Sequence, residues 1–157
     1  INAVDQRLDR LSKELGLLDR ELSILDNEQS NIFWSRTKNL EVFKSLKSNL
    51  LRIVVPISET LQVIQKFKNY EIKYFIDWGG SLVWASFDQL NTKILNEIKD
   101  IVKKHQGYFT LIKVEEDIKA SADIFTIDSI KYKISEKIKR SFDPKRIFNP
   151  GKMYTGI

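Results

Sequence analysis

The order of short periodic stretches between residues 50 and 114 limits the possible folds most strongly. Four of these stretches are rich in β-branched and aromatic residues, which is typical of strands. The other two repeat apolar residues every three or four positions, which is typical of helices. In chain order, with the residues that cap or end the helices included, the stretches are a strand at 50–55, a helix at 58–69, strands at 72–78 and 81–87, a helix at 88–107 and a strand at 108–114.

The two middle strands flank Gly79-Gly80, so we expect them to form a hairpin. The order strand, helix, strand, strand, helix, strand is the ferredoxin-like plan, in which helices pack on one face of an antiparallel sheet. We therefore predict an α+β fold built on a ferredoxin-like sheet, with extra helices before it and a helix and tail after it.

The chain length of 157 residues suits a single domain. Within it we expect a helical region at 1–47, the ferredoxin-like core at 48–114, and a C-terminal helix with its tail at 129–157. The connection at 115–128 is charged and lacks a clear period, so we expect a long loop with a short extended piece at Ile124-Phe125.

The N-terminal region carries apolar residues in alternating steps of four and three. They are Val4, Leu8, Leu11, Leu15, Leu18, Leu22 and Leu25. This heptad seam predicts either self-association through residues 4–25 as a coiled coil or an amphipathic helix that packs on its own domain. A second helix follows, for which Ser30 or Asn31 is the expected N-cap.

Composition excludes several kinds of chemistry. The chain has no cysteine, so it forms no disulfide and ligates no iron–sulfur cluster. No apolar run reaches the length of about 18 residues that a membrane span needs. The formal net charge is +5, but the lysines are dispersed, which favours a solvated surface over a nucleic-acid site. The single histidine, His105, lies near a helix end and is predicted to be a surface residue.

The C-terminal stretch combines a helix, a stop and a rigid turn. The helix has one apolar face formed by Ile130, Ile134, Ile138 and Phe142, and Pro144 ends it by restricting Asp143. Ile147-Phe148 is predicted to be an apolar plug. Asn149-Pro150-Gly151 is a turn, because proline fixes φ and glycine tolerates positive φ.

This tail resembles the end of the FAD-linked oxidases of the vanillyl-alcohol oxidase type, which finish on a "DP..I.NPGK" pattern. Two upstream segments are similar to one branch of that family, the FAD-binding subunits of glycolate oxidase. They are the strand from Arg52 to Pro56 and the hairpin from Ile76 to Trp84, and the helix with Phe33-Trp34 adds to them. The resemblance runs from about residue 32 to 154.

The resemblance implies that residues 1–157 form the C-terminal cap domain of a larger flavoprotein, whose N-terminal FAD-binding domain lies outside these residues. Such an assembly oxidises glycolate or related 2-hydroxy acids to 2-oxo acids, with a sister flavin subunit and an iron–sulfur subunit as partners. FAD would be bound mainly by the N-terminal domain, so the isolated chain is expected to be inactive. The expected location is cytoplasmic, with possible attachment to the inner face of the membrane through partners.

One departure limits the predicted role. Catalytic sister subunits of the family carry metal-binding histidines in the corresponding hairpin, where this chain has Ile76 and Val83. We therefore expect no catalytic residue and no metal ligand in this chain. The predicted role is to support the flavin and the assembly of the complex.

Five residues are candidates for the functional site. Asn149 and Lys152 stand on the rigid turn and are predicted to face the cofactor. Arg52, Asp77 and Trp78 are predicted to face the substrate, since a cation can pair with a carboxylate and an indole can lie over a flavin. The alternatives are a paired edge-strand arginine, a surface ion pair of Asp77 with Lys73 or Lys113, and a Trp that packs on the sheet.

Two other functions stay open. A basic ferredoxin-like sheet can bind single-stranded nucleic acid if aromatic rings stand on its strands, and Tyr74, Phe75 and Phe109 are the candidates. A coiled-coil interaction module built on residues 4–25 is the other.

Overall fold

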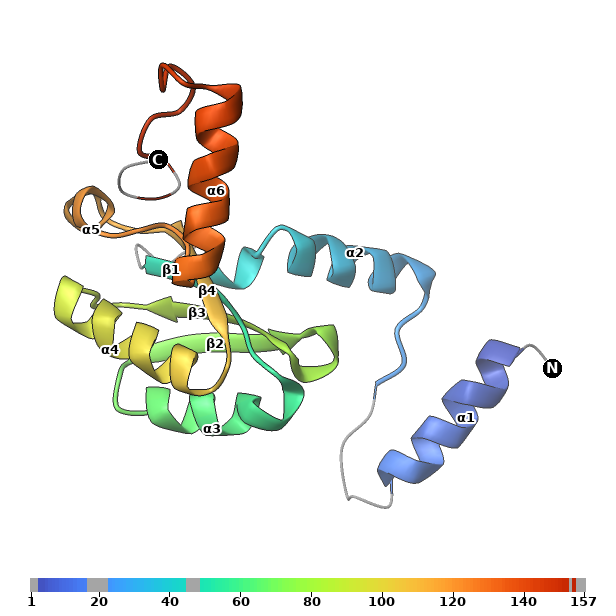
Figure 1. The fold of residues 1–157 in the computed structure, drawn as a ribbon. Helices are drawn as coiled ribbons and strands as arrows, with labels where there is room; N and C mark the ends of the chain where they lie inside the picture. The colour runs from blue at the N-terminus through green and yellow to red at the C-terminus, as the bar shows by residue number, and fades with distance from the viewer. Residues whose placement is uncertain (1–2, 17–22, 45–48, 153, 155–157) are drawn as a thin grey trace. The chain divides into compact units, whose positions relative to one another are not determined.

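The computed structural model describes residues 3–16, 23–44, 49–152 and 154, except for the side chains of residues 120 and 121. It divides into two compact units, Ile1–Ser45 and Leu46–Ile157. The first unit is helical where it is described, and the second contains the sheet (Figure 1).

The second unit is built on a four-stranded antiparallel sheet with the strand order β2-β3-β1-β4. The helices α3 (Ile57–Phe67) and α4 (Thr92–Lys104) pack on one face of it (Figure 1). This arrangement confirms the predicted α+β, ferredoxin-like fold. The strands are β1 (Asn49–Val54), β2 (Ile72–Asp77), β3 (Leu82–Phe87) and β4 (Tyr108–Lys113).

The core lies between the sheet and these two helices. Leu51 and Ile53 of the central strand β1 are fully buried, and Phe67 of α3 meets Phe87 of β3 edge to face, with ring centroids 5.7 Å apart. Gly107 precedes β4, and a Cβ atom there would lie 2.7 Å from the backbone oxygen of Val54. Only glycine therefore lets α4 turn into β4 this close to β1.

The helix starts differ from the predicted ones. Asp26, rather than Ser30 or Asn31, caps α2 (Asn27–Lys38), and it forms a capping box with Gln29. Both Ser30 and Asn31 lie inside the helix. The local signal was ambiguous, because several capping residues follow one another in this stretch.

The connection after β4 is more ordered than a long loop. It contains α5 (Glu116–Ser121), and then residues 124–126 run along the outer edge of β4. The Leu111 N–H donates to the Ile124 carbonyl at 2.8 Å, and the Thr126 N–H donates to the Phe109 carbonyl at 3.1 Å. The expected extended piece at Ile124-Phe125 is thus present, and it covers one edge of the sheet.

The first unit contains α1 (Ala3–Gly16), α2 and a short 3₁₀ turn at Glu41–Phe43. No side chain of α1 is buried. The seam residues Val4, Leu8, Leu11, Leu15 and Leu25 are exposed, whereas Leu18 and Leu22 lie outside the described residues. None of the helices in the described ranges is long and apolar enough to cross a membrane.

Candidate functional site

The face of the sheet opposite α3 and α4 carries Arg52. Because side chains alternate along a strand, Arg52 of β1 points away from the buried Leu51 and Ile53. It stands opposite Trp84 of β3 on one side and Thr110 of β4 on the other. The strand β1 is central, so the alternative of an edge-strand arginine is wrong.

The Arg52 guanidinium lies over an indole. Its Cζ atom is 4.8 Å from the centroid of the Trp78 ring, which is a cation–π distance. Within the described residues, no carboxylate lies within ion-pair distance of Arg52. Arg52 therefore has donors available for an anion.

The hairpin tip that holds Trp78 is a tight 3₁₀ turn, Trp78–Gly80. The Asp77 carboxylate accepts the N–H of Trp78 at 2.7 Å, and Trp78 itself has a positive φ of 53°. The hydroxyl of Thr60 on α3 donates to the Gly80 carbonyl. Asp77 thus shapes the tip, and among the described residues it forms no ion pair with Lys73 or Lys113.

An aromatic pair lies next to Arg52 on the same face of the sheet. Phe75 of β2 stands opposite Trp84 of β3, with ring centroids 6.4 Å apart and planes tilted by 32°. Phe109, which was a candidate for base stacking, is instead fully buried on the helix side. Tyr74 also belongs to the helix side, because it stands opposite the buried Ala85.

A cavity of about 630 Å³ opens beside Arg52. It lies between β4, the segment after α5 and α6 (Ser129–Phe142). Its polar lining includes Arg52, Lys131, Tyr108, Thr110 and Tyr154. Lys131 is paired with Asp128 at 3.5 Å. Arg52 and the hydroxyl groups around this space suit an anionic oxygen ligand. No sequence pattern pointed to Lys131, Tyr108 or Tyr154 here, because they come from separate elements.

The segment after α6, residues 143–152, is here called the strap. Asp143 organises its start: its carboxylate accepts the N–H groups of Ile147 and Phe148 at 2.9 Å each and pairs with Lys139 at 2.8 Å. The Lys139 ammonium also donates to the Phe148 carbonyl. The hydrogen bond from Lys139 and the two backbone N–H groups lower the pKa of Asp143 to about 2. Asp143 was predicted only as a helix stop, so its role was missed.

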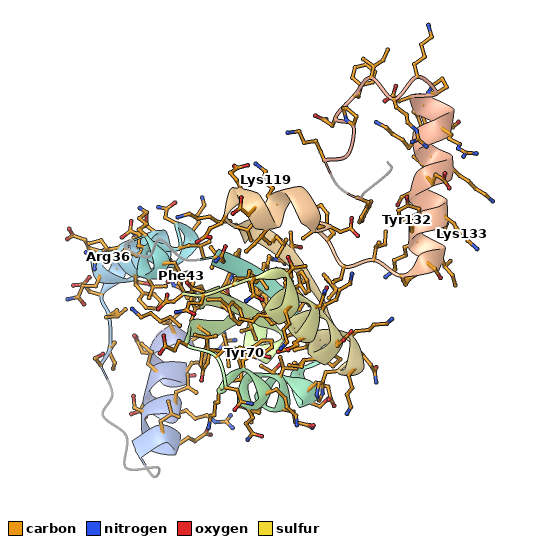
Figure 2. The ribbon with its side chains drawn as sticks, turned by 90° about the vertical axis from the view of Figure 1, so that its left-hand side faces the viewer. Arg36, Phe43, Tyr70, Lys119, Tyr132 and Lys133 are labelled. Atoms are coloured by element: carbon orange, nitrogen blue, oxygen red, sulfur yellow. The ribbon has the colours of Figure 1, made fainter. Side chains whose placement is uncertain are left out.

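The apolar face of α6 is exposed. We call Ile130, Ile134, Ile138 and Phe142 the apolar stripe, and their side chains are 70%, 52%, 55% and 85% exposed. Ile134 also lines the cavity beside Arg52. On another side of the helix, Tyr132 meets Tyr154 edge to face, with ring centroids 6.1 Å apart. Figure 2 shows Tyr132 and Lys133 on different sides of α6.

The predicted apolar plug at Ile147-Phe148 is wrong. These residues are 66% and 68% exposed, so they do not seal the core. The error has a simple cause, because an apolar residue in a sequence indicates that burial is favourable without indicating which surface covers it.

Asn149 and Lys152 are exposed on the strap. The turn is compact, since Asn149 and Gly151 have positive φ angles of 46° and 67° and the Lys152 N–H donates to the Asn149 carbonyl at 3.2 Å. Neither residue lines the cavity beside Arg52. The predicted site residues therefore form two groups: Arg52, Asp77 and Trp78 on the sheet, and Asn149 and Lys152 on the strap.

His105 is not a surface residue. Its side chain is 11% exposed, and Nδ1 lies 2.6 Å from a carboxylate oxygen of Glu59, which ties the end of α4 to α3. Among the described residues, no group of three or more His, Cys, Asp or Glu side chains is arranged to hold a metal ion.

Comparison with known proteins gives one distant relative. Over 131 residues, which are 83% of this chain and 33% of the relative, the sequence is 25% identical to glycolate oxidase subunit GlcE of Escherichia coli (strain K12). The chain thus spans about a third of the length of that relative. No family model matches the chain, and no solved structure matches it significantly. The similarity supports a distant relationship to an oxidase subunit of this type.

Proposed function

We propose that this chain is the C-terminal cap domain of an FAD-dependent oxidoreductase subunit of the glycolate oxidase type. The proposal joins the motif resemblance and the distant similarity to glycolate oxidase subunit GlcE. A separate FAD-binding domain would dock on the cap, and the whole assembly would oxidise a small 2-hydroxy acid to a 2-oxo acid.

The observation that carries the proposal is the exposed apolar stripe together with Ile147 and Phe148. A monomer rarely leaves this many large apolar side chains exposed on one helix face and the segment after it, and exposed apolar patches mark docking surfaces. The strap beside the stripe is held by Asp143, so a domain that covered these side chains would also meet Asn149 and Lys152.

Each group of site residues has a role in this proposal. Lys152 would approach an anionic oxygen of the cofactor, and Asn149 would hydrogen-bond near the flavin ring. Arg52, with Trp78 beneath its guanidinium, would bind the carboxylate of the 2-hydroxy acid, and Asp77 would fix the hairpin tip that holds Trp78. FAD, when bound, would take two electrons from the hydroxy acid. The sequence has no glycine-rich loop at a predicted helix start, so the cofactor's phosphates would be held by the other domain.

The wider setting follows from the same proposal. The protein would work with a sister flavin subunit and an iron–sulfur subunit, and its part would be support of the flavin and of assembly. It would lie in the cytoplasm, with any membrane attachment made through those partners.

The test is to produce the chain joined to the sequence that precedes it in its gene. We expect the longer protein to copurify with FAD, measured by its visible absorption, and the flavin to be bleached by glycolate but not by acetate once the partner subunits are added. Acetate is the matched control because it keeps the carboxylate and lacks the hydroxyl group. A folded but colourless longer protein, or an upstream sequence without a flavin-binding domain, would refute the proposal.

A second candidate function rests on the Phe75–Trp84 pair beside Arg52. Aromatic rings and a cation on the face of a ferredoxin-like sheet opposite its helices are the groups that stack on and neutralise single-stranded RNA. A gel shift with single-stranded RNA that weakens with salt and is lost in Trp84→Ala would favour this function over the first.

A further inference from the structure

The two edges of the sheet differ. The outer edge of β4 is covered by residues 124–126, which hydrogen-bond to it. The strand β2 pairs with β3 on one side, and within the described residues no segment pairs with its other side. Alternate residues of such an edge strand turn their N–H and C=O groups outward, where another strand can pair with them.

The side chains of β2 are arranged for an antiparallel partner. Lys73, Phe75 and Asp77 share the face of the sheet opposite α3 and α4, while Tyr74 and Ile76 share the helix side and are 46% and 40% exposed. No acidic side chain of the described residues pairs with Lys73. The strand therefore offers a cation at one end and an anion at the other.

We propose that β2 is a self-association edge, where a second copy of this chain adds its own β2 antiparallel about a two-fold axis at Phe75. In this register Lys73 faces Asp77 of the second copy, and Asp77 faces Lys73 of the second copy. Tyr74 meets Ile76 of the second copy on the helix side, and Phe75 marks the position of the axis. The result is a continuous eight-stranded sheet in which each of these off-axis pairs occurs twice.

The charges select this register over its neighbours. With the axis at Tyr74 or Ile76, Lys73 does not stand opposite Asp77 of the second copy. With the axis at Lys73 or Asp77, two like charges stand directly opposite each other, which is destabilising. A lysine on an edge strand usually discourages association. Here, however, the same strand carries the matching carboxylate two residues beyond the axis, so a second copy neutralises it.

The expected association is weak and depends on concentration. One six-residue strand buries much less than the roughly 1,200 Å² of a stable interface. Each cross-strand pair is worth about 0.2–1 kcal/mol. Because the two-fold axis repeats the pair, turning Lys73 into an acid removes two attractions and adds two repulsions. We expect this change to shift dimerisation to at least about fourfold higher concentration.

The experiment is sedimentation equilibrium of the chain over a wide concentration range, with the native protein, Lys73→Glu, and the swap Lys73→Asp with Asp77→Lys. The native mass should rise from 18.4 kDa towards twice that value. Lys73→Glu should remain monomeric where the native chain dimerises, and the swap should restore dimers because it exchanges both charges. Lys113→Glu, on the covered edge strand, is the matched control and should dimerise like the native chain. Circular dichroism verifies that each variant is folded.

Three results would overturn the proposal. The native chain could stay monomeric throughout the range, Lys73→Glu could dimerise unchanged, or the swap could fail to restore dimers although it folds. The heptad seam of α1 is the competing surface, and Leu11→Glu tests it. Dimers that Leu11→Glu abolishes and Lys73→Glu leaves intact would assign the association to α1 instead of β2.

Discussion

The apolar stripe of α6 makes a quantitative prediction about the pair Ile138→Ala and Phe142→Ala. Burying a whole Ile or Phe side chain is worth about 1.5–3 kcal/mol. Alanine keeps only Cβ, and the native side chains are 55% and 85% exposed in this chain. Scaled by these fractions, the pair loses about 1–3 kcal/mol of docking free energy. The proposed flavin domain should therefore bind about 5- to 150-fold more weakly.

The same pair should leave the chain itself intact. The two side chains contribute little to its own core, and alanine favours helix at least as well as Ile or Phe. The free energy of unfolding of the isolated chain should be unchanged, or higher by up to about 0.5 kcal/mol. If the stripe is a docking face, the two substitutions weaken binding and leave the stability of the chain unchanged. If the stripe belongs to the chain's own core, they lower its stability.

The measurements are urea unfolding of the isolated chain and a fluorescence titration of the FAD-loaded domain with it. Leu61→Ala is the matched control, since Leu61 is 68% exposed on α3, away from the stripe. It should change neither binding nor stability. A loss of more than about 2 kcal/mol of stability in the Ile138→Ala and Phe142→Ala pair would place the stripe in the chain's own core and refute the reasoning.

Single residues give three more tests. The pKa of Asp143 is about 2 in the folded chain, against an ordinary value of 3.8. Its contribution to the stability of the folded chain is therefore complete above pH 3.8 and is lost as the pH falls through about 2. The amide NMR signals of Ile147 and Phe148 should change over this pH range, and Asp143→Asn should abolish the change. Gly107→Ala should destabilise the chain by about 1–3 kcal/mol in urea unfolding, because its Cβ would overlap the backbone of β1; an unchanged midpoint would mean that β1 can move. In the assembled oxidase, Arg52→Gln should raise the KM for glycolate by about 10- to 150-fold, since a hydrogen bond to a charged group is worth about 1.5–3 kcal/mol; an unchanged KM would exclude Arg52 as the carboxylate ligand.

The element types could be predicted from the sequence because their signals are local. The β-branched and aromatic residues along 72–77 and the helical period of 92–104 predict β2 and α4 without reference to the rest of the chain. The helix starts were less certain. Asp26 and Ser30 are both good caps, and only the complete helix decides which of them lies at its end.

The sites on this fold depend on where separate elements meet. Arg52 was found by its position on a strand, but Lys131 and Tyr154 share its cavity only because α6 and the strap return beside β4. Asp143 looked like a helix stop, and its two backbone N–H partners exist only once the strap turns back. Such contacts join residues that have no common pattern in the chain.

The order of strands and helices and the polarity of each face were already encoded in the local sequence, because both depend on periodicities of two and 3.6 residues. Which apolar faces are covered became known only from the folded chain. Ile98 of α4 is buried and Ile138 of α6 is exposed, although both belong to clear helical patterns. The difference arises because the hydrophobic effect has no direction: it favours burial of a face without naming the surface that covers it.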